Sequence, residues 1–140
     1  MKSTTLIASA LLAVSLNSFA QSQTETFFSV TSADNQAQGM AMVLAGQMAE
    51  QKAAVRILLC GPAGLLALKT FEPAALKPKN TSPKQMMTGL MKAGATVEVC
   101  ALFLPNADKT AADLIEGVAV AKPPEVAAYM VKPGVRSFGF

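Results

Sequence analysis

The segment Val55–Cys60 constrains the fold of this chain most, because it is apolar at every position except Arg56. A strand with one wet face alternates polar and apolar residues, whereas a nearly continuous apolar run is typical of a parallel strand covered on both faces. We therefore expect this segment to be an interior strand of a parallel sheet.

Other strand-like runs alternate along the chain with helices whose ends carry capping residues. Asp34 is placed to cap a first helix, while Ser82 and Gln85 form a capping box and Gly94 follows the end of a later helix. The alternation predicts an α/β fold, with a parallel sheet and helices on both faces. The expected strands are residues 27–31, 55–60, 95–100, 118–120 and 135–140, and the expected helices are residues 35–51, 62–69, 83–93, 110–116 and 124–131.

Apolar residues at helical spacing in the first helix are expected to pack on the sheet. Small residues beside them would permit a close approach. The expected core stripe is Met40, Val43, Leu44 and Met48, and the small residues are Gly39, Ala45 and Gly46.

The charge pattern does not favour nucleic acid as a partner. The formal charge is only +3, and the lysines are spread along the chain. Lys77, Lys79 and Lys84 fall in or beside a Pro-rich segment over residues 72–81, which we expect to be a surface loop with a solvated basic face. A second loop is expected over residues 101–105, and its apolar character suggests contact with a neighbour.

The N-terminus predicts a secretory signal peptide. Lys2 precedes a mostly apolar run over residues 6–16, and the small residues Ser18 and Ala20 fit the two positions that a signal peptidase reads. The run is too short to span a bilayer as a helix, which disfavours the alternative of a retained anchor. We expect cleavage after Ala20, leaving residues 21–140 as one periplasmic domain with no membrane segment.

Two cysteines, Cys60 and Cys100, each follow a strand-like run, at the edge of the sheet where open α/β folds bind ligands. The chain has no histidine, which excludes Ser-His and Cys-His catalysis and most transition-metal sites. Three interpretations of the pair remain open. Both can be buried packing residues, they can form a disulfide in an oxidising compartment, or Cys100 can be reactive with Cys60 idle or resolving.

The surroundings of the thiols differ in sequence. Cys60 precedes a helix start at residues 61–64, which would stabilise a thiolate, whereas apolar residues follow Cys100. Residues 61–64 lack the spacing and the lysine of a phosphate-binding loop and are interpreted as a tight turn. Glu98, Asp108 and Asp113 are expected to be solvated or to cap helices.

Four phrases of the sequence resemble the DsrE/DsrF-like family, particularly its exported single-domain members. The phrases are residues 55–68, 82–87, 92–100 and 112–118. The resemblance implies a three-layer α/β/α fold, with about five mainly parallel strands in an order like 4-3-2-1-5. It also implies a homo-oligomer, either a trimer or a hexamer, and it calls for no cofactor.

Several members of that family carry sulfur as a cysteine persulfide in sulfur relay or oxidation, on a cysteine that ends the third strand. Cys100 matches that cysteine, so the resemblance implies that Cys100 is a sulfur carrier that exchanges with a donor or acceptor protein or a small sulfur compound. Exported relatives often read Cys-Pro-x-Cys here, whereas this chain has Phe103 at the position of the second cysteine. The alternatives are a non-catalytic binding or assembly module and a thiol-disulfide oxidoreductase that uses Cys60 with Cys100.

Overall fold

The computed structural model describes residues 23–140, so the signal peptide expected at residues 1–20 lies outside the described part. Five parallel strands form one sheet in the order β4-β3-β2-β1-β5. The α/β class is confirmed, and so is the strand order that the resemblance implied. The strands are β1 (Glu25–Val30), β2 (Ala54–Leu59), β3 (Thr96–Val99), β4 (Ala119–Val120) and β5 (Val135–Gly139).

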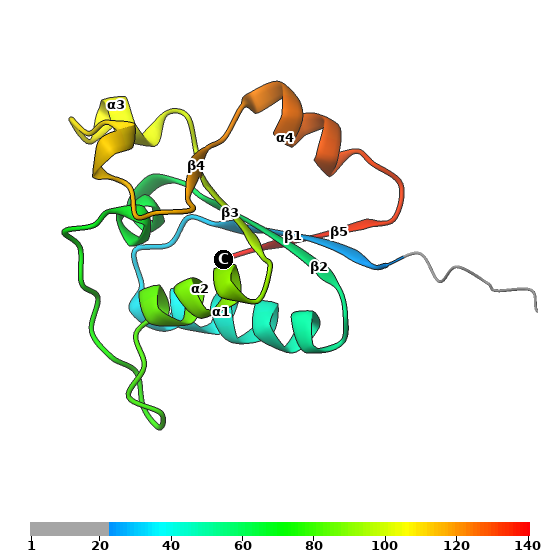
Figure 1. Ribbon diagram of the computed structural model, residues 1–140, viewed down its shortest axis with the longest axis horizontal. Helices are drawn as coiled ribbons and strands as arrows, with labels where there is room; N and C mark the ends of the chain where they lie inside the picture. Colours follow the sequence, from blue (N-terminus) through cyan, green and yellow to red (C-terminus); the bar gives the residue numbers. More distant parts are fainter. Residues whose placement is uncertain (1–22) are drawn as a thin grey trace, which may run out of the picture.

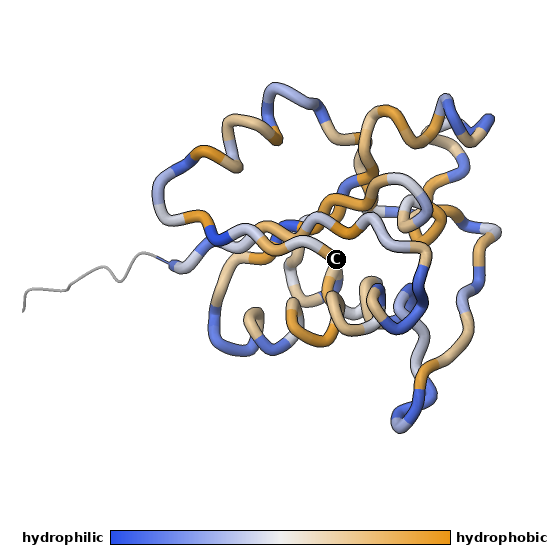
Figure 2. The backbone as a smooth tube through the Cα atoms, turned by 180° about the vertical axis from the view of Figure 1, so that it is seen from behind, coloured by the Kyte–Doolittle hydropathy of each residue, from blue (hydrophilic) through white to orange (hydrophobic). Residues whose placement is uncertain are grey.

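Helices cover the two faces of the sheet unequally. Helix α1 (Asn35–Glu50) and helix α2 (Pro83–Lys92) lie together on one face, and α4 (Pro123–Met130) covers the other, as Figure 1 shows. The larger core lies between the sheet and the first pair of helices. Phe27, Ala121 and Val126 form a second, smaller core beneath α4. Apolar segments accordingly run through the middle of the fold (Figure 2).

Strand β2 lies between β1 and β3, in the interior position predicted from its apolar composition. Its one polar side chain is accommodated in an ion pair, because the Arg56 Nε lies 2.7 Å from a carboxylate oxygen of Glu98 on β3. The same guanidinium lies 4.8 Å above the ring of Tyr129 on α4. Glu98 is therefore buried and paired, and the expectation that it is solvated was wrong.

Helix α1 begins where predicted, since the Asp34 carboxylate accepts a hydrogen bond from the Ala37 N–H at 2.7 Å. Its buried face was predicted wrongly. Met40 is 52% exposed, and Val43 and Leu44 are exposed as well, whereas Met48 packs partly against the core. The face that packs inward also has helical spacing and is richer in small residues, which lets the helix approach closely: Gln38, Ala41, Met42 and Ala45, beside buried Gly39.

Helix α2 carries both hydrogen bonds of the predicted capping box. The Gln85 N–H donates to the Ser82 hydroxyl, and the Ser82 N–H donates to the Gln85 side chain at 2.9 Å. Gly94 follows with a φ of +100°, a conformation that favours glycine. The end of this helix is thus determined by local chemistry.

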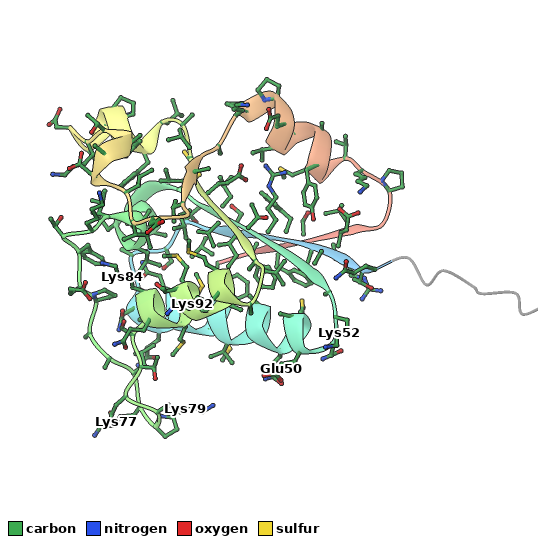
Figure 3. All side chains as sticks on the ribbon, viewed as in Figure 1. Glu50, Lys52, Lys77, Lys79, Lys84 and Lys92 are labelled. Carbon is green, nitrogen blue, oxygen red and sulfur yellow. The ribbon has the colours of Figure 1, made fainter. Side chains whose placement is uncertain are left out.

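Lys84 on α2 does not belong to the solvated basic face that was expected. Its Nζ donates to the carbonyl oxygens of Leu68 at 2.9 Å and Phe71 at 2.6 Å, and it pairs with the Glu72 carboxylate at 2.9 Å. Figure 3 shows Lys77 and Lys79 at the tip of the intervening loop, well away from Lys84. The three lysines therefore do not form one patch.

The remaining short elements differ modestly from expectation. Residues 101–105 are not a plain loop, because α3 (Phe103–Asn106) is a helical turn. The 3₁₀ helix η1 (Gly61–Ala67) begins where the short helix with Pro62 in its first turn was predicted and ends before the predicted residue 69, and η2 (Ala111–Asp113) is shorter than predicted. Within residues 23–140, no helix combines the length and apolarity that a membrane crossing requires.

Candidate functional site

The parallel register brings Cys60 and Cys100 together at the carboxyl edge of the sheet. Leu59 of β2 pairs with Val99 of β3, and each cysteine is the next residue of its chain. The Cys100 N–H donates to the Leu59 carbonyl at 2.8 Å, which continues the ladder between the two strands. Cys60 is also extended, with φ −130° and ψ 162°. Because side chains alternate along extended backbone, register and pleat place both thiols on the same side.

Both cysteines are free and half-buried, so neither is the fully buried packing residue of the first interpretation. The pKa of Cys60 is raised from an ordinary 9.0 to about 12. The largest cause is partial burial, which disfavours the charged thiolate. Hydrogen bonding to Cys100 and repulsion from a negative charge on Cys100 raise it further. Cys60 therefore keeps its proton at neutral pH.

The helix that follows Cys60 does not stabilise its thiolate, contrary to the sequence-based expectation. Element η1 is a 3₁₀ helix of seven residues, and the Cys60 side chain makes no capping hydrogen bond to it. Burial and the neighbouring thiol determine the direction of the pKa shift instead. A thiol held in its protonated form in this way is a poor nucleophile, because the thiolate is the reacting form.

The two thiols open into a cleft of about 770 Å³ at this edge of the sheet. One wall comes from η1 and the other from the segment around α3. Leu102 stands at the rim and is 72% exposed, whereas Phe103 is buried. The lining residues are Cys60, Gly61, Pro62, Leu65, Cys100, Leu102, Phe103, Asn106 and Ala107.

Phe103 occupies the position of the second cysteine in the Cys-Pro-x-Cys phrase of the resembled relatives. Its ring packs against Gly64 of η1, and a Cβ at Gly64 would overlap the ring carbons. The aromatic ring thus forms part of the wall of the cleft. The thiol nearest to Cys100 comes instead from the neighbouring strand.

The other polar residues singled out in the sequence do not join this cleft. Asp113 completes a capping box with Thr110, because its carboxylate accepts a hydrogen bond from the Thr110 N–H at 2.8 Å. This capping role was predicted. Asp108 is exposed, with a φ of +50°. Among residues 23–140, no group of three or more metal-ligating side chains gathers in one place.

Sequence reasoning identified both thiols but missed the rest of the cleft wall. Leu65 and Asn106 gave no signal, because an isolated apolar residue in η1 and a surface amide are common in any fold. Leu102 and Phe103 were noted as part of an apolar loop expected to contact a neighbour, and Phe103 also as the residue in place of a second cysteine. Phe103 and Leu104 instead pack within their own subunit, and only Leu102 is exposed.

Two solved structures are similar to this fold. The ychN protein from E. coli superposes with a TM-score of 0.67 at 19% sequence identity, covering 83% of this chain and 99% of its own. MTH1491, a protein of unknown function from Methanobacterium thermoautotrophicum, gives a TM-score of 0.63 at 12% identity, covering 83% of this chain and 98% of its own. Both have the DsrE/DsrF-like fold, which confirms the three-layer α/β/α architecture that the resemblance implied. No protein-family model and no curated protein matches the sequence.

Proposed function

We propose that this protein binds and relays sulfane sulfur, carried as a persulfide on Cys100. The observation that supports this most is the position of Cys100. It directly follows β3 at the carboxyl edge of a DsrE/DsrF-like sheet and lines an open cleft. That edge is where parallel α/β sheets place their ligands, and the resembled family keeps its carrier thiol at the end of the third strand.

Loading from a persulfide donor R–S–SH moves one sulfur and needs no external oxidant. The Cys100 sulfur attacks the outer sulfur of the donor, a new S–S bond forms at Cys100, and the S–S bond of the donor breaks. The leaving R–S⁻ takes up the proton that Cys100 loses. The products are Cys100–S–SH and R–SH, and the reverse steps deliver the sulfur to an acceptor thiol.

Cys60 assists as a neighbouring hydrogen-bond donor. Its raised pKa keeps the thiol protonated at neutral pH, and the interaction with Cys100 is among the causes of that shift. A protonated thiol beside a sulfur that carries negative charge stabilises that charge. The proposal therefore assigns the covalent step to Cys100 and a supporting role to Cys60.

The test is to incubate the purified mature protein with inorganic polysulfide and to read its intact mass. The wild type is expected to gain the mass of one or more sulfur atoms, and a thiol reductant should remove them. Cys100→Ser should gain none. Cys60→Ser, the matched single-thiol variant, should still load but more slowly. Absence of an adduct on the wild type, or an equal adduct on Cys100→Ser, contradicts the proposal.

A second candidate function is thiol-disulfide exchange between Cys60 and Cys100, and the pairing of the two thiols in register favours it. Adjacent strands lie about 4.8 Å apart, within the roughly 4.4–6.8 Å between Cα atoms that a disulfide spans. A substrate R–S–S–R would oxidise the pair to a disulfide and leave as two R–SH. Thiol titration of the exported protein under denaturing conditions, with and without reductant, tests this. Two free thiols in both samples would remove this candidate.

We also propose a periplasmic location and a homo-oligomer, either a trimer or a hexamer, on the grounds given by the N-terminus and by the resemblance. A donor or acceptor protein, or a small sulfur compound, would be the partner. In the apolar segment Leu102-Phe103-Leu104, which suggested a purely non-catalytic assembly module, only Leu102 is exposed, since Phe103 and Leu104 pack within the subunit.

A further inference from the structure

The cleft that holds both thiols presents an apolar surface. Apart from the two thiols, its wall consists mainly of aliphatic, aromatic and proline side chains. Of the described residues that line it, none carries a charged side chain, and only Asn106 contributes an amide. A volume of about 770 Å³ lies within the range of small-molecule sites.

Three polar groups beside the thiols are already engaged. The Asn106 Nδ2 donates to the Leu102 carbonyl at 2.7 Å. The Cys60 N–H donates to Val30 at 3.0 Å, and the Phe103 N–H donates to the Cys100 carbonyl at 2.9 Å. These groups therefore do not offer free donors to an anion in the cleft.

An anionic sulfur compound would lose hydration in such a cleft without gaining a paired cation. Burying an unpaired charge is strongly unfavourable, whereas apolar groups gain about 25 cal/mol for each Å² removed from water. The upward pKa shift of Cys60 has burial as its largest cause, which is consistent with an environment that disfavours negative charge. Thiosulfate and inorganic polysulfide are both anions, so the cleft is poorly matched to them.

We propose that the natural donor at this site is an uncharged organic sulfane-sulfur compound, such as a trisulfide R–S–S–S–R with small apolar groups that pack against Leu65, Leu102 and Phe103. This inference rests on the proposed persulfide chemistry of Cys100 and names its substrate class. Inorganic polysulfide then serves as a general loading reagent rather than as the preferred donor.

The reaction balances without another oxidant or reductant. The Cys100 sulfur attacks the central sulfur of R–S–S–S–R, the S–S bond between that sulfur and one terminal sulfur breaks, and the R–S⁻ that leaves takes the proton of Cys100. The protein then holds Cys100–S–S–S–R. The released R–SH attacks the R-bound sulfur, which gives Cys100–S–SH and R–S–S–R.

The test compares two trisulfides of similar size, dipropyl trisulfide and the trisulfide of 3-mercaptopropionate, which carries two carboxylates. Loading rates on Cys100 are measured by intact mass. Each rate is divided by the rate at which the same trisulfide reacts with a small reference thiol, so that the difference in intrinsic reactivity between the two trisulfides cancels. We expect the uncharged donor to load at least tenfold faster on this scale. Leu102→Lys adds a cation at an exposed rim position, and it should reduce that preference severalfold without unfolding the protein.

The outcomes separate the two proposals. Equal normalised rates, or faster loading by the dicarboxylate, overturn the inference about substrate class while leaving Cys100 as a carrier. An unchanged preference in a folded Leu102→Lys variant also overturns it, because charge at the rim would then not control access. Absence of any adduct on Cys100 from either trisulfide and from inorganic polysulfide overturns the proposed function itself.

Discussion

At the scale of single residues, the chemistry of the site depends on the state of two thiols. Cys60 is held in its protonated form by burial first and by Cys100 second. Cys100 is exposed to the same cleft, and its neighbour is a thiol on the adjacent strand rather than a second cysteine of its own segment. The reactivity of Cys60 therefore depends on the presence of Cys100.

Replacing Cys100 should make Cys60 reactive at lower pH. Cys100→Ala removes two of the causes that raise the Cys60 pKa, hydrogen bonding and charge repulsion, and leaves burial. The Cys60 pKa should then fall from about 12 toward its ordinary 9.0 without reaching it. The rate of iodoacetamide alkylation at Cys60, followed by peptide mass against pH, checks this because the thiolate is the reacting form. If the alkylation profile of Cys60 in this variant is identical to that in the wild type, Cys100 does not raise the pKa of Cys60, and the prediction is wrong.

A methyl group at Gly64 should disturb the wall of the cleft. Its Cβ would overlap the Phe103 ring, and relieving such overpacking typically costs about 1–3 kcal/mol. Gly64→Ala should therefore lower the free energy of unfolding, measured with urea, by that amount. Gly89→Ala is the matched control. A Cβ there meets nothing within 4 Å in the middle of α2, so it should stabilise the protein by up to about 1 kcal/mol.

At the scale of elements, the boundaries of most helices and strands followed from local sequence. Asp34 caps α1 and Ser82 caps α2 as predicted, because each side chain bonds N–H groups within its own first turn. The face of α1 that packs against the sheet could not be predicted from local sequence. Its sequence has two apolar stripes at helical spacing, one through Met40 and one through Met42, and local pattern cannot distinguish them.

The orientation of α1 can be tested with two substitutions of the same kind. Met42 is 2% exposed, so Met42→Gln places an amide in the core and should lower the free energy of unfolding by about 2 kcal/mol or more. Met40 is exposed, so Met40→Gln should change it by less than about 0.5 kcal/mol. Chemical denaturation of both variants gives the comparison. A larger cost at Met40 would mean that the helix is turned the other way or that this face is covered in an assembly.

At the scale of the whole molecule, the prediction concerns export and assembly. If residues 1–20 are a signal peptide, the protein recovered from the periplasm of an expressing cell should begin at Gln21, as N-terminal sequencing or intact mass would show. Its molar mass by light scattering should be three or six times that of one mature chain. A protein that keeps Met1 or stays in the cytoplasm contradicts the first expectation, and a monomer contradicts the second.

The sequence by itself determined the α/β class, the interior strand and the capped helix boundaries. Each of these depends on interactions within a few residues or on the apolar character of one segment. It also identified the two cysteines as the residues to examine, but it left a disulfide, idle thiols and a carrier as open alternatives.

Only the tertiary structure decided which side chains meet. The register of β2 with β3 placed Cys60 beside Cys100, the packing of η1 against Phe103 shaped an uncharged cleft, and Lys84 and Glu98 proved to be buried and paired. Each of these arrangements joins residues that are far apart in the chain. Their contact energies depend on how whole elements pack, and this information is absent from any local window of sequence.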